Sequence, residues 1–339
     1  MNYFIFGGAG FVGTHLTKLL KEIHPESMIY NLDIVEPVTQ MFTIKGYNAV
    51  LKEGEEVTSQ YIYCDVRKSI ELEFVNVTDE DVVFNFAAVH RTPGHPDQAY
   101  FETNIRGAEN VCAFAEKFGI KKIVFTSSIA PYGAAEDLKT EETLPTPNTP
   151  YGISKLVAEK IHTIWQAKKL NERQLTIVRP GVVFGKGENG NFTRLYWGIR
   201  GGKFFYPGRK DTIKACIYVK ELVRFMLYRL ENHSEGVELY NCTFESAFTI
   251  EQIVETMKKA TGLQRTIVKV PGSLLMTVAS IVGPLGGKAL GICPARVKKL
   301  MISTNICGKK LADSGYKFHY TFEEAIKDWY RDNDGQCLR

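Results

Sequence analysis

The feature that most constrains the fold is an alternation of short apolar runs with helical stretches over the first 180 residues. The runs are rich in β-branched and aromatic residues and lack polar alternation, which is typical of strands buried on both faces. Strands that alternate with helices predict a parallel, doubly wound α/β sheet. We expect strands at 2–7, 28–33, 60–66, 82–88, 122–128 and 175–180, and helices at 11–23, 104–119 and 152–169.

A glycine-rich loop connects the first expected strand to the first expected helix. The stretch "GGAGFVG" spaces Gly7, Gly10 and Gly13 as GxxGxxG, and Asp33 ends the second strand twenty residues after Gly13. In a Rossmann-type sheet such glycines allow a tight turn and a close approach of the backbone to a pyrophosphate at a helix N-terminus. A carboxylate at the position of Asp33 accepts hydrogen bonds from a ribose diol and repels a 2′-phosphate. The sequence therefore predicts NAD as the cofactor and disfavours NADP.

Tyr151 and Lys155 stand four residues apart in "TPYGISK", just after Pro150, where a helix is expected to begin. Residues at this spacing project from one helix face, so the phenol and the ammonium can reach one ligand. A tyrosine phenol has an ordinary pKa of about 10. We expect the ammonium and the positive nicotinamide of oxidised NAD to lower that pKa, so that Tyr151 can accept a proton from an alcohol.

Ser128 ends the expected fifth strand, in "TSS". Ligands bind at the carboxyl ends of the strands in such sheets, so Ser128 is placed to orient the substrate oxygen. A Tyr and a Lys four apart are, by themselves, ordinarily a solvated helix face. The glycine loop, Asp33 and Ser128 in the expected order favour catalysis over that alternative.

Charge and cysteine usage exclude several classes of function. A formal net charge of +4 over 339 residues, with scattered Lys and Arg, does not indicate nucleic-acid binding and favours a small-molecule substrate. The seven cysteines lack CxxC or CxxH spacing, so we expect neither a metal site nor a disulfide framework. Free thiols of this kind favour a reducing, cytoplasmic location. Residues 273–293 are apolar, but Pro284, four glycines and Lys288 interrupt them, so we expect no membrane span and leave peripheral membrane contact open.

Ordered motifs along nearly the whole chain carry a family resemblance. They are "GGAGFVG", "CDV", "FNFAAVH", "NIRGAENV", "TSSIAPYG", "YGISK" and "RPGVVFG". With them the chain resembles an extended short-chain dehydrogenase/reductase of the NAD-dependent epimerase/dehydratase type, which acts mainly on nucleotide sugars. The resemblance implies that Ser128, Tyr151 and Lys155 are catalytic and that the protein forms a homodimer.

The resemblance also implies a set of cofactor-binding residues. They are Gly7, Gly10, Phe11, Val12 and Gly13 at the pyrophosphate, Asp33 at the adenosine ribose, Asp65 and Val66 beside the adenine, Phe86, Ala87 and Ala88 in the cofactor channel, Asn104 behind the site, Tyr151 and Lys155 at the nicotinamide ribose, and Pro180 beside the nicotinamide.

Departures from the family pattern narrow the reaction. Ser128 is followed by Ile129 and Ala130, where the family's 4,6-dehydratases have an acid and a base, so dehydration is disfavoured. Val182 replaces the Asn that commonly touches the substrate diphosphate, and Lys214 stands where an Arg often does. Lys neutralises a phosphate without the bidentate fork of Arg. The candidate substrate residues are His90, Arg209 and Lys214, each of which can also be an ordinary loop residue.

We expect residues 1–180 to form the NAD-binding domain, with a further strand near 237–242. Residues 181–236 and 243–335 would form a smaller substrate-binding part, with amphipathic helices that begin near Thr249 and Thr321. The leading hypothesis is an NAD-dependent epimerase, or a 4-keto reductase or dehydrogenase, that acts on a nucleotide-sugar hydroxyl by hydride transfer. Two alternatives stay open: an NAD(P)-dependent dehydrogenase of a hydrophobic, sterol-like alcohol, and a sensor that binds NAD without turnover.

Overall fold

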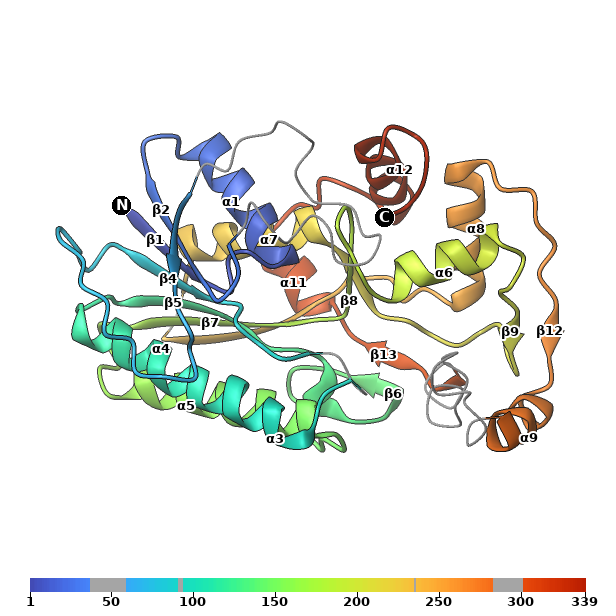
Figure 1. Cartoon of the computed structure of the whole chain (residues 1–339), viewed down its shortest axis with the longest axis horizontal. Helices are drawn as coiled ribbons and strands as arrows, with labels where there is room; N and C mark the ends of the chain where they lie inside the picture. The colour runs from blue at the N-terminus through green and yellow to red at the C-terminus, as the bar shows by residue number, and fades with distance from the viewer. Residues whose placement is uncertain (37–58, 91–93, 235, 283–300) are drawn as a thin grey trace.

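The computed structural model describes residues 1–36, 59–90, 94–234, 236–282 and 301–339. Seven strands form one sheet in the order β11-β7-β5-β4-β1-β2-β3, and every neighbouring pair is parallel (Figure 1). The strands are β1 (Asn2–Phe6), β2 (Met28–Asp33), β3 (Gln60–Tyr63), β4 (Val82–Asn85), β5 (Lys122–Thr126), β7 (Gln174–Pro180) and β11 (Val237–Cys242). The strand order reverses between β1 and β4, and in doubly wound sheets this switch point opens the ligand-binding crevice at the carboxyl edge.

Helices cover both faces of the sheet. On one face α1 (Phe11–Ile23) contacts α7 (Val219–Glu231), and on the other α4 (Arg106–Lys117) contacts α5 (Pro150–Ala167) (Figure 1). Each layer encloses its own apolar core, the first around Ile5, Leu16 and Phe84 and the second around Phe4, Phe114 and Trp165. Two short elements, α3 (Asp97–Tyr100) and the π-helical turn η2 (Phe101–Ile105), lead into α4.

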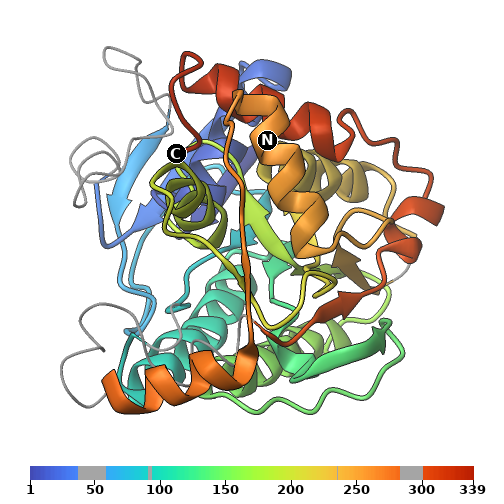
Figure 2. The same cartoon turned by 90° about the vertical axis from the view of Figure 1, so that its right-hand side faces the viewer.

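A smaller part of the chain lies beyond the carboxyl edge of the sheet (Figures 1 and 2). Its short strands pair in parallel: β8 (Val182–Phe184) with β10 (Cys216–Tyr218), β9 (Tyr206–Pro207) with β12 (Lys269–Val270), and β6 (Ala135–Lys139) with β13 (Thr304–Ile306). The helical elements here are η3 (Ala130–Tyr132), α6 (Asn191–Arg200), α8 (Ile250–Thr261), α9 (Gly272–Val282) and α12 (Phe322–Asp332). α11 (Lys309–Asp313) instead contacts β11 of the sheet, and its Leu311 belongs to the first core. A third core surrounds Phe184 and Trp329.

The predicted fold class, a Rossmann-type parallel sheet with helices on both faces, is confirmed. The strand expected at 237–242 joins β7, and helices begin at both expected places, each with a capping box, at Thr249 and at Thr321. The expected division into a domain and a substrate-binding part assigns α7 to the latter. In the structure α7 packs on α1 and β7, because Leu222, Val223, Phe225 and Met226 complete the core beneath that face of the sheet.

Leu16 offers a test of the first core. Its side chain is fully buried on α1, whereas Leu144 is 78% exposed in a loop. We expect Leu16→Ala to lower the free energy of unfolding by about 2–5 kcal/mol, because it removes buried methyl groups and leaves a cavity. The matched Leu144→Ala should change it by less than about 0.5 kcal/mol. Urea unfolding of both variants measures the difference, and similar values for the two would contradict the packing described.

Candidate active site

The glycine loop holds three parts of the sheet edge together. Gly7 has φ +77°, and a Cβ there would lie 2.6 Å from the backbone nitrogen of Ala87, just after β4. A Cβ on Gly13 would lie 2.6 Å from the Cα of Gly8. These positions accept only glycine, because the obstructing atoms are backbone. The loop therefore brings the start of α1 against the ends of β1 and β4, as the sequence predicts for a dinucleotide-binding turn.

Asp33 lies at the end of β2 beside this loop. Its carboxylate accepts hydrogen bonds from the backbone N–H of Ala9 at 3.1 Å and of Val35 at 3.2 Å. Burial raises the pKa of Asp33, while these backbone donors act in the opposite direction. Each carboxylate oxygen keeps acceptor capacity for a ribose hydroxyl. The glycine loop leaves no room for side chains, so a pyrophosphate can approach its backbone, and the Asp33 carboxylate beside it can accept ribose hydroxyls. The residues present therefore fit NAD.

The other expected cofactor residues lie around the same edge. Phe86 donates its backbone N–H to the carbonyl of Phe6 at 2.8 Å, which extends β4 toward Ala87 and Ala88. The Asp65 carboxylate accepts from Arg67 Nε at 2.8 Å and from Arg67 Nη2 at 2.7 Å, and these bonds hold the pKa of Asp65 below its usual range. Phe11 and Val12 lie in the first turn of α1, Val66 follows Asp65, and Pro180 ends β7.

Asn104 connects the β4 loop to the helix that carries Tyr151. Its Oδ1 accepts from the N–H of Val89 at 2.9 Å, and its Nδ2 donates to the Val89 carbonyl at 3.1 Å and to Ser154 Oγ at 2.8 Å. Ser154 Oγ in turn donates to the Tyr151 carbonyl at 2.9 Å. The π-helical turn η2 contains Asn104, and such turns occur frequently at functional sites.

The catalytic candidates meet where α5 begins. Thr149 caps the helix by accepting the Gly152 N–H at 3.1 Å, and Pro150 occupies the first turn, so the start of α5 is locally encoded. The Ser128 side chain lies close enough to the Tyr151 phenol to lower its pKa, and Ser128 Oγ accepts the Ala130 N–H at 3.1 Å. Ser128 follows β5 and Tyr151 opens α5, so the structure brings together two residues that the sequence separates by more than twenty positions.

Lys155 is buried directly behind Tyr151. Its ammonium donates to the Thr126 carbonyl at 2.8 Å and lies 4.8 Å from the centre of the Phe125 ring. Burial lowers the pKa of Lys155 to about 7, and the charge of Glu159 opposes this shift. The residue can therefore be neutral or charged near neutral pH.

The pKa of Tyr151 was expected to fall under the combined influence of the nearby ammonium and the positive nicotinamide of oxidised NAD. In the protein alone, burial raises the pKa of Tyr151, and the Ser128 side chain lowers it by a smaller amount. Desolvation of the phenolate is therefore the largest influence in this state. The lowering of the pKa with oxidised NAD in the site stays a prediction.

A buried ion pair below the site escaped the sequence reasoning. Arg179 on β7 donates to both carboxylate oxygens of Glu159 on α5, at 2.8 Å and 2.6 Å, and Ser127 Oγ also donates to Glu159. The Arg179 guanidinium lies 4.7 Å from the centre of the Tyr132 ring. The spacing Tyr151, Lys155, Glu159 continues one helix face and was the available signal for Glu159.

The candidate substrate residues are less closely tied to this centre. His90 is exposed after β4. Arg209 forms ion pairs with Asp211 at 2.9 Å and Glu136 at 3.2 Å, and Lys214 donates to the Ile302 carbonyl at 2.6 Å. Both cations thus have protein partners next to β6 and β13, and their contact with a substrate diphosphate stays a prediction.

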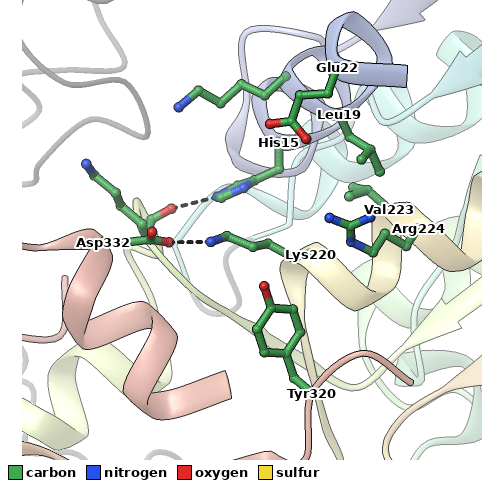
Figure 3. A pocket seen from close by; sticks show the side chains of 10 residues that line it. His15, Leu19, Glu22, Lys220, Val223, Arg224, Tyr320 and Asp332 are labelled. Carbon is green, nitrogen blue, oxygen red and sulfur yellow. Dashed lines mark hydrogen bonds and ion pairs between the residues drawn. The ribbon is translucent and has the colours of Figure 1, made fainter. Parts of the chain in front are cut away.

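A separate cavity of about 380 Å³ opens between α1, α7 and α12 (Figure 3). Lys220 points across it to Asp332 at 2.8 Å, and His15 Nε2 lies 2.9 Å from the Lys186 carbonyl. Burial lowers the pKa of His15 to about 3, so this imidazole is neutral. Ser128, Tyr151 and Lys155 do not line the cavity, and we assign it no catalytic role.

None of the helices in the part of the chain that the structure describes has both the length and the apolar character that a membrane span needs. Within the same ranges no group of three or more His, Cys, Asp or Glu side chains could hold a metal ion. The expected apolar stretch 273–293 is described only as far as residue 282, so its remainder lies outside the described residues.

The low pKa of Lys155 predicts a pH-dependent stability. Between the folded pKa of about 7 and the unfolded pKa of about 10.4, the unfolded chain binds one more proton at this residue. The free energy of unfolding of the wild type should therefore rise from pH 7 to pH 9 relative to Lys155→Met, by up to about 1.4 kcal/mol per pH unit. Urea unfolding at several pH values tests this. As a control, Lys317→Met, at an exposed position, should differ from the wild type by an amount that does not change with pH. If the free energies of unfolding of Lys155→Met and the wild type change with pH in parallel, the lowered pKa of Lys155 is contradicted.

Comparisons with known proteins agree with this geometry. Residues 3–243 match the model of the NAD dependent epimerase/dehydratase family. N-acetyl-alpha-D-glucosaminyl-diphospho-ditrans,octacis-undecaprenol 4-epimerase of Escherichia coli O157:H7 is 31% identical over 96% of this chain and 93% of its own length. The 3beta-hydroxysteroid-dehydrogenase/decarboxylase isoform 1 of Arabidopsis thaliana is 24% identical over 95% of this chain and 77% of its own length.

A solved structure of UDP-glucuronic acid 4-epimerase from Bacillus cereus, in complex with NAD, superimposes with a TM-score of 0.72. It covers 98% of this chain and 99% of its own at 20% identity, a level that shows a shared fold. The family match and the glycine cradle together confirm NAD as the expected cofactor. The chain belongs to the NAD-dependent epimerase/dehydratase family, within the extended short-chain dehydrogenase/reductases.

Proposed function

We propose that this protein is an NAD-dependent 4-epimerase that inverts a hydroxyl of a sugar carried on a diphosphate, such as a nucleotide sugar. The observation that carries the proposal is the meeting of Ser128, Tyr151 and buried Lys155 at the carboxyl edge of the sheet, next to the glycine loop. The undecaprenol 4-epimerase of Escherichia coli O157:H7, which matches nearly the full length of both chains, supports the choice of reaction.

In this proposal the three side chains have distinct tasks. Bound NAD supplies the acceptor and donor of hydride. The Ser128 hydroxyl holds the substrate oxygen beside the Tyr151 phenol, which takes the hydroxyl proton and later returns it. Lys155 places a positive charge behind the phenol when it is protonated, and its bond to the Thr126 carbonyl keeps that charge in position. These contacts stabilise the phenolate, which burial alone disfavours.

Inversion requires the sugar ketone to present both faces to the hydride donor. The protein must therefore hold the substrate mainly through the group beyond the sugar. Lys214 and Arg209 are the cations that we propose for the diphosphate, with His90 near the sugar. Cations that are already paired can still contribute attraction to a doubly charged group, although part of their charge is compensated.

We infer that 4,6-dehydration is not part of the activity. The side chains that follow Ser128 are Ile129 and Ala130, in the turn that leads into η3. Neither can donate or accept a proton, so elimination of water would lack its acid and base. A reaction confined to one hydroxyl needs only the Ser, Tyr and Lys that are present.

A second candidate is a dehydrogenase of a hydrophobic alcohol. The likeness to a plant steroid dehydrogenase/decarboxylase over most of this chain favours it. A nucleoside diphosphate such as UDP should raise the thermal unfolding temperature of a nucleotide-sugar epimerase and leave a steroid dehydrogenase unchanged. We further propose a homodimer in the cytoplasm, which size-exclusion chromatography with light scattering and cell fractionation can test.

The amount of resident cofactor distinguishes an epimerase from a net reductase. An internal hydride cycle works only if NAD stays bound between turnovers, whereas a reductase exchanges it each time. We expect the purified protein, once denatured, to release close to one NAD per chain. A protein that releases almost none would contradict the epimerase and favour the 4-keto reductase or dehydrogenase.

Tyr151→Phe tests the proton transfer. This variant keeps the ring and loses the hydroxyl, so we expect turnover to fall by about 10²–10⁴-fold while NAD content stays unchanged. Tyr330→Phe, on α12, is the matched control and should keep full activity. Sugar inversion by the wild type and both variants is the measurement. Full activity in Tyr151→Phe would exclude the assigned role, and a wild type that binds NAD without any turnover would favour the sensor.

A further inference from the structure

Two segments far apart in the sequence form one face of the molecule. They are residues 191–207, which contain α6 and β9, and residues 262–282, which contain β12 and α9. In Figure 2 α6, β12 and α9 lie on the face turned toward the viewer, which is the right-hand end of Figure 1. We call the exposed side chains of these two segments the α6–α9 face.

Direct bonds join the two segments. β9 pairs with β12, and Tyr206 donates its N–H to the Val268 carbonyl at 2.9 Å. Arg265 donates to the Arg200 carbonyl at 3.4 Å. Buried neighbours anchor the segment from α6 to β9, because Tyr196, Ile199 and Tyr206 belong to the third core. The face is thus carried by packed elements of the fold.

Large apolar side chains are exposed along this face. Trp197 is 42% exposed, Phe205 38%, Val268 62% and Leu274 55%. Single exposed apolar residues are common on proteins, but several on one face mark an interaction surface. Trp197 lies under the Arg200 guanidinium, which is 5.1 Å from the ring. An aromatic ring with an adjacent cation suits the boundary between a polar headgroup layer and apolar chains.

The charge of the same two segments has a single sign. They contain Arg194, Arg200, Lys203, Arg265 and Lys269 and no Asp or Glu. All five basic residues are exposed. The carboxylates of α8, which packs against α6, are paired within their own surroundings: Glu251 with Lys210 at 2.7 Å and Glu255 with Lys258 at 2.9 Å. The residues of the α6–α9 face therefore combine positive charge of a single sign with exposed apolar side chains.

We propose that the α6–α9 face docks on an anionic lipid bilayer. Basic residues attract anionic headgroups while apolar side chains enter the boundary with the acyl chains. A second copy of the chain fits less well, since a twofold interface places each patch against itself and would oppose like charges. The phosphates of a nucleic acid would pair with the basic residues, but they offer no partner for Val268 and Leu274.

The location of the face suits the proposed activity. Its elements lie beyond the carboxyl edge of the sheet, on the side where β5 ends and α5 begins (Figure 1). The inference rests on the proposed function in one respect: a sugar diphosphate whose carrier is a lipid would reach the enzyme at this surface. The docking itself requires no turnover, so it can fail or succeed independently of the epimerase activity.

Vesicle co-sedimentation of the full chain tests the proposal. The probes are vesicles of phosphatidylcholine alone and of an equimolar mixture with phosphatidylglycerol, at low and high salt. We expect the wild type to sediment with the anionic vesicles at low salt and to be released at high salt. Tyr151→Phe should sediment equally well, because the docking surface is separate from the proton-transfer residue.

Matched variants locate the surface. Lys269→Glu should weaken vesicle binding by about tenfold or more, whereas Lys317→Glu, exposed elsewhere, should have little effect. The double variant Phe205→Ser/Leu274→Ser should also weaken it, and the control Val75→Ser/Leu144→Ser, at residues 81% and 78% exposed, should not. Unchanged thermal unfolding and NAD content verify that the variants fold.

Three results would overturn the docking. The first is a wild type that does not sediment with anionic vesicles, and the second is an equal loss of binding in the control variants. The third is a dimer that Phe205→Ser/Leu274→Ser dissociates while vesicle binding is absent, which would assign the face to a second copy. Docking without any sugar inversion would instead uphold this inference and contradict the proposed epimerase.

Discussion

The site depends on how α5 is bound to the edge of the sheet. Lys155 donates to the Thr126 carbonyl at the end of β5, and one turn later Glu159 pairs with Arg179 on β7. These groups are buried, and burying charges costs free energy that only well-formed partners offset. The contacts set the position and rotation of the helix relative to two strands. Because Tyr151 lies one turn before Lys155, the same contacts determine where the phenol meets Ser128.

A second constraint acts on the opposite side of the crevice. Gly7 and Gly13 leave no space for a side chain between the start of α1 and the end of β4. Asn104 then ties the continuation of β4 to α5 through Val89 and Ser154. The cofactor cradle and the proton-transfer residues are therefore parts of one hydrogen-bonded unit. Their relative placement follows from backbone contacts, for which glycine, Asn and Ser are suited by size and by local hydrogen bonding.

Local signals predicted much of this architecture. α1 spans the expected residues 11–23, and helices begin where they were expected, after Thr149, Thr249 and Thr321. The pairings of β6 with β13 and β9 with β12 were not predicted, since these strands are short and their partners are distant in sequence. The same limit applies to the ion pair of Arg179 and Glu159. The sequence offered only one signal for it, the spacing of Glu159 on the same helix face as Tyr151 and Lys155. Burial, which no motif states, raises the pKa of Tyr151 in the protein alone.

The burial of Tyr151 and Lys155 bears on how the proposed reaction would be controlled. In the protein alone burial favours a neutral Tyr151 and lowers the pKa of Lys155 to about 7, so neither group is held firmly in its charged form. A positive charge near the phenol favours phenolate, and a phenolate near Lys155 favours the ammonium, so the two ionisations reinforce each other. In the proposed reaction, the proton acceptor would then form only when cofactor and substrate oxygen are in place. If Tyr151 transfers the proton as proposed, its burial with Lys155 would couple that transfer to occupancy of the crevice, which a solvated pair, screened by water, would do far less effectively.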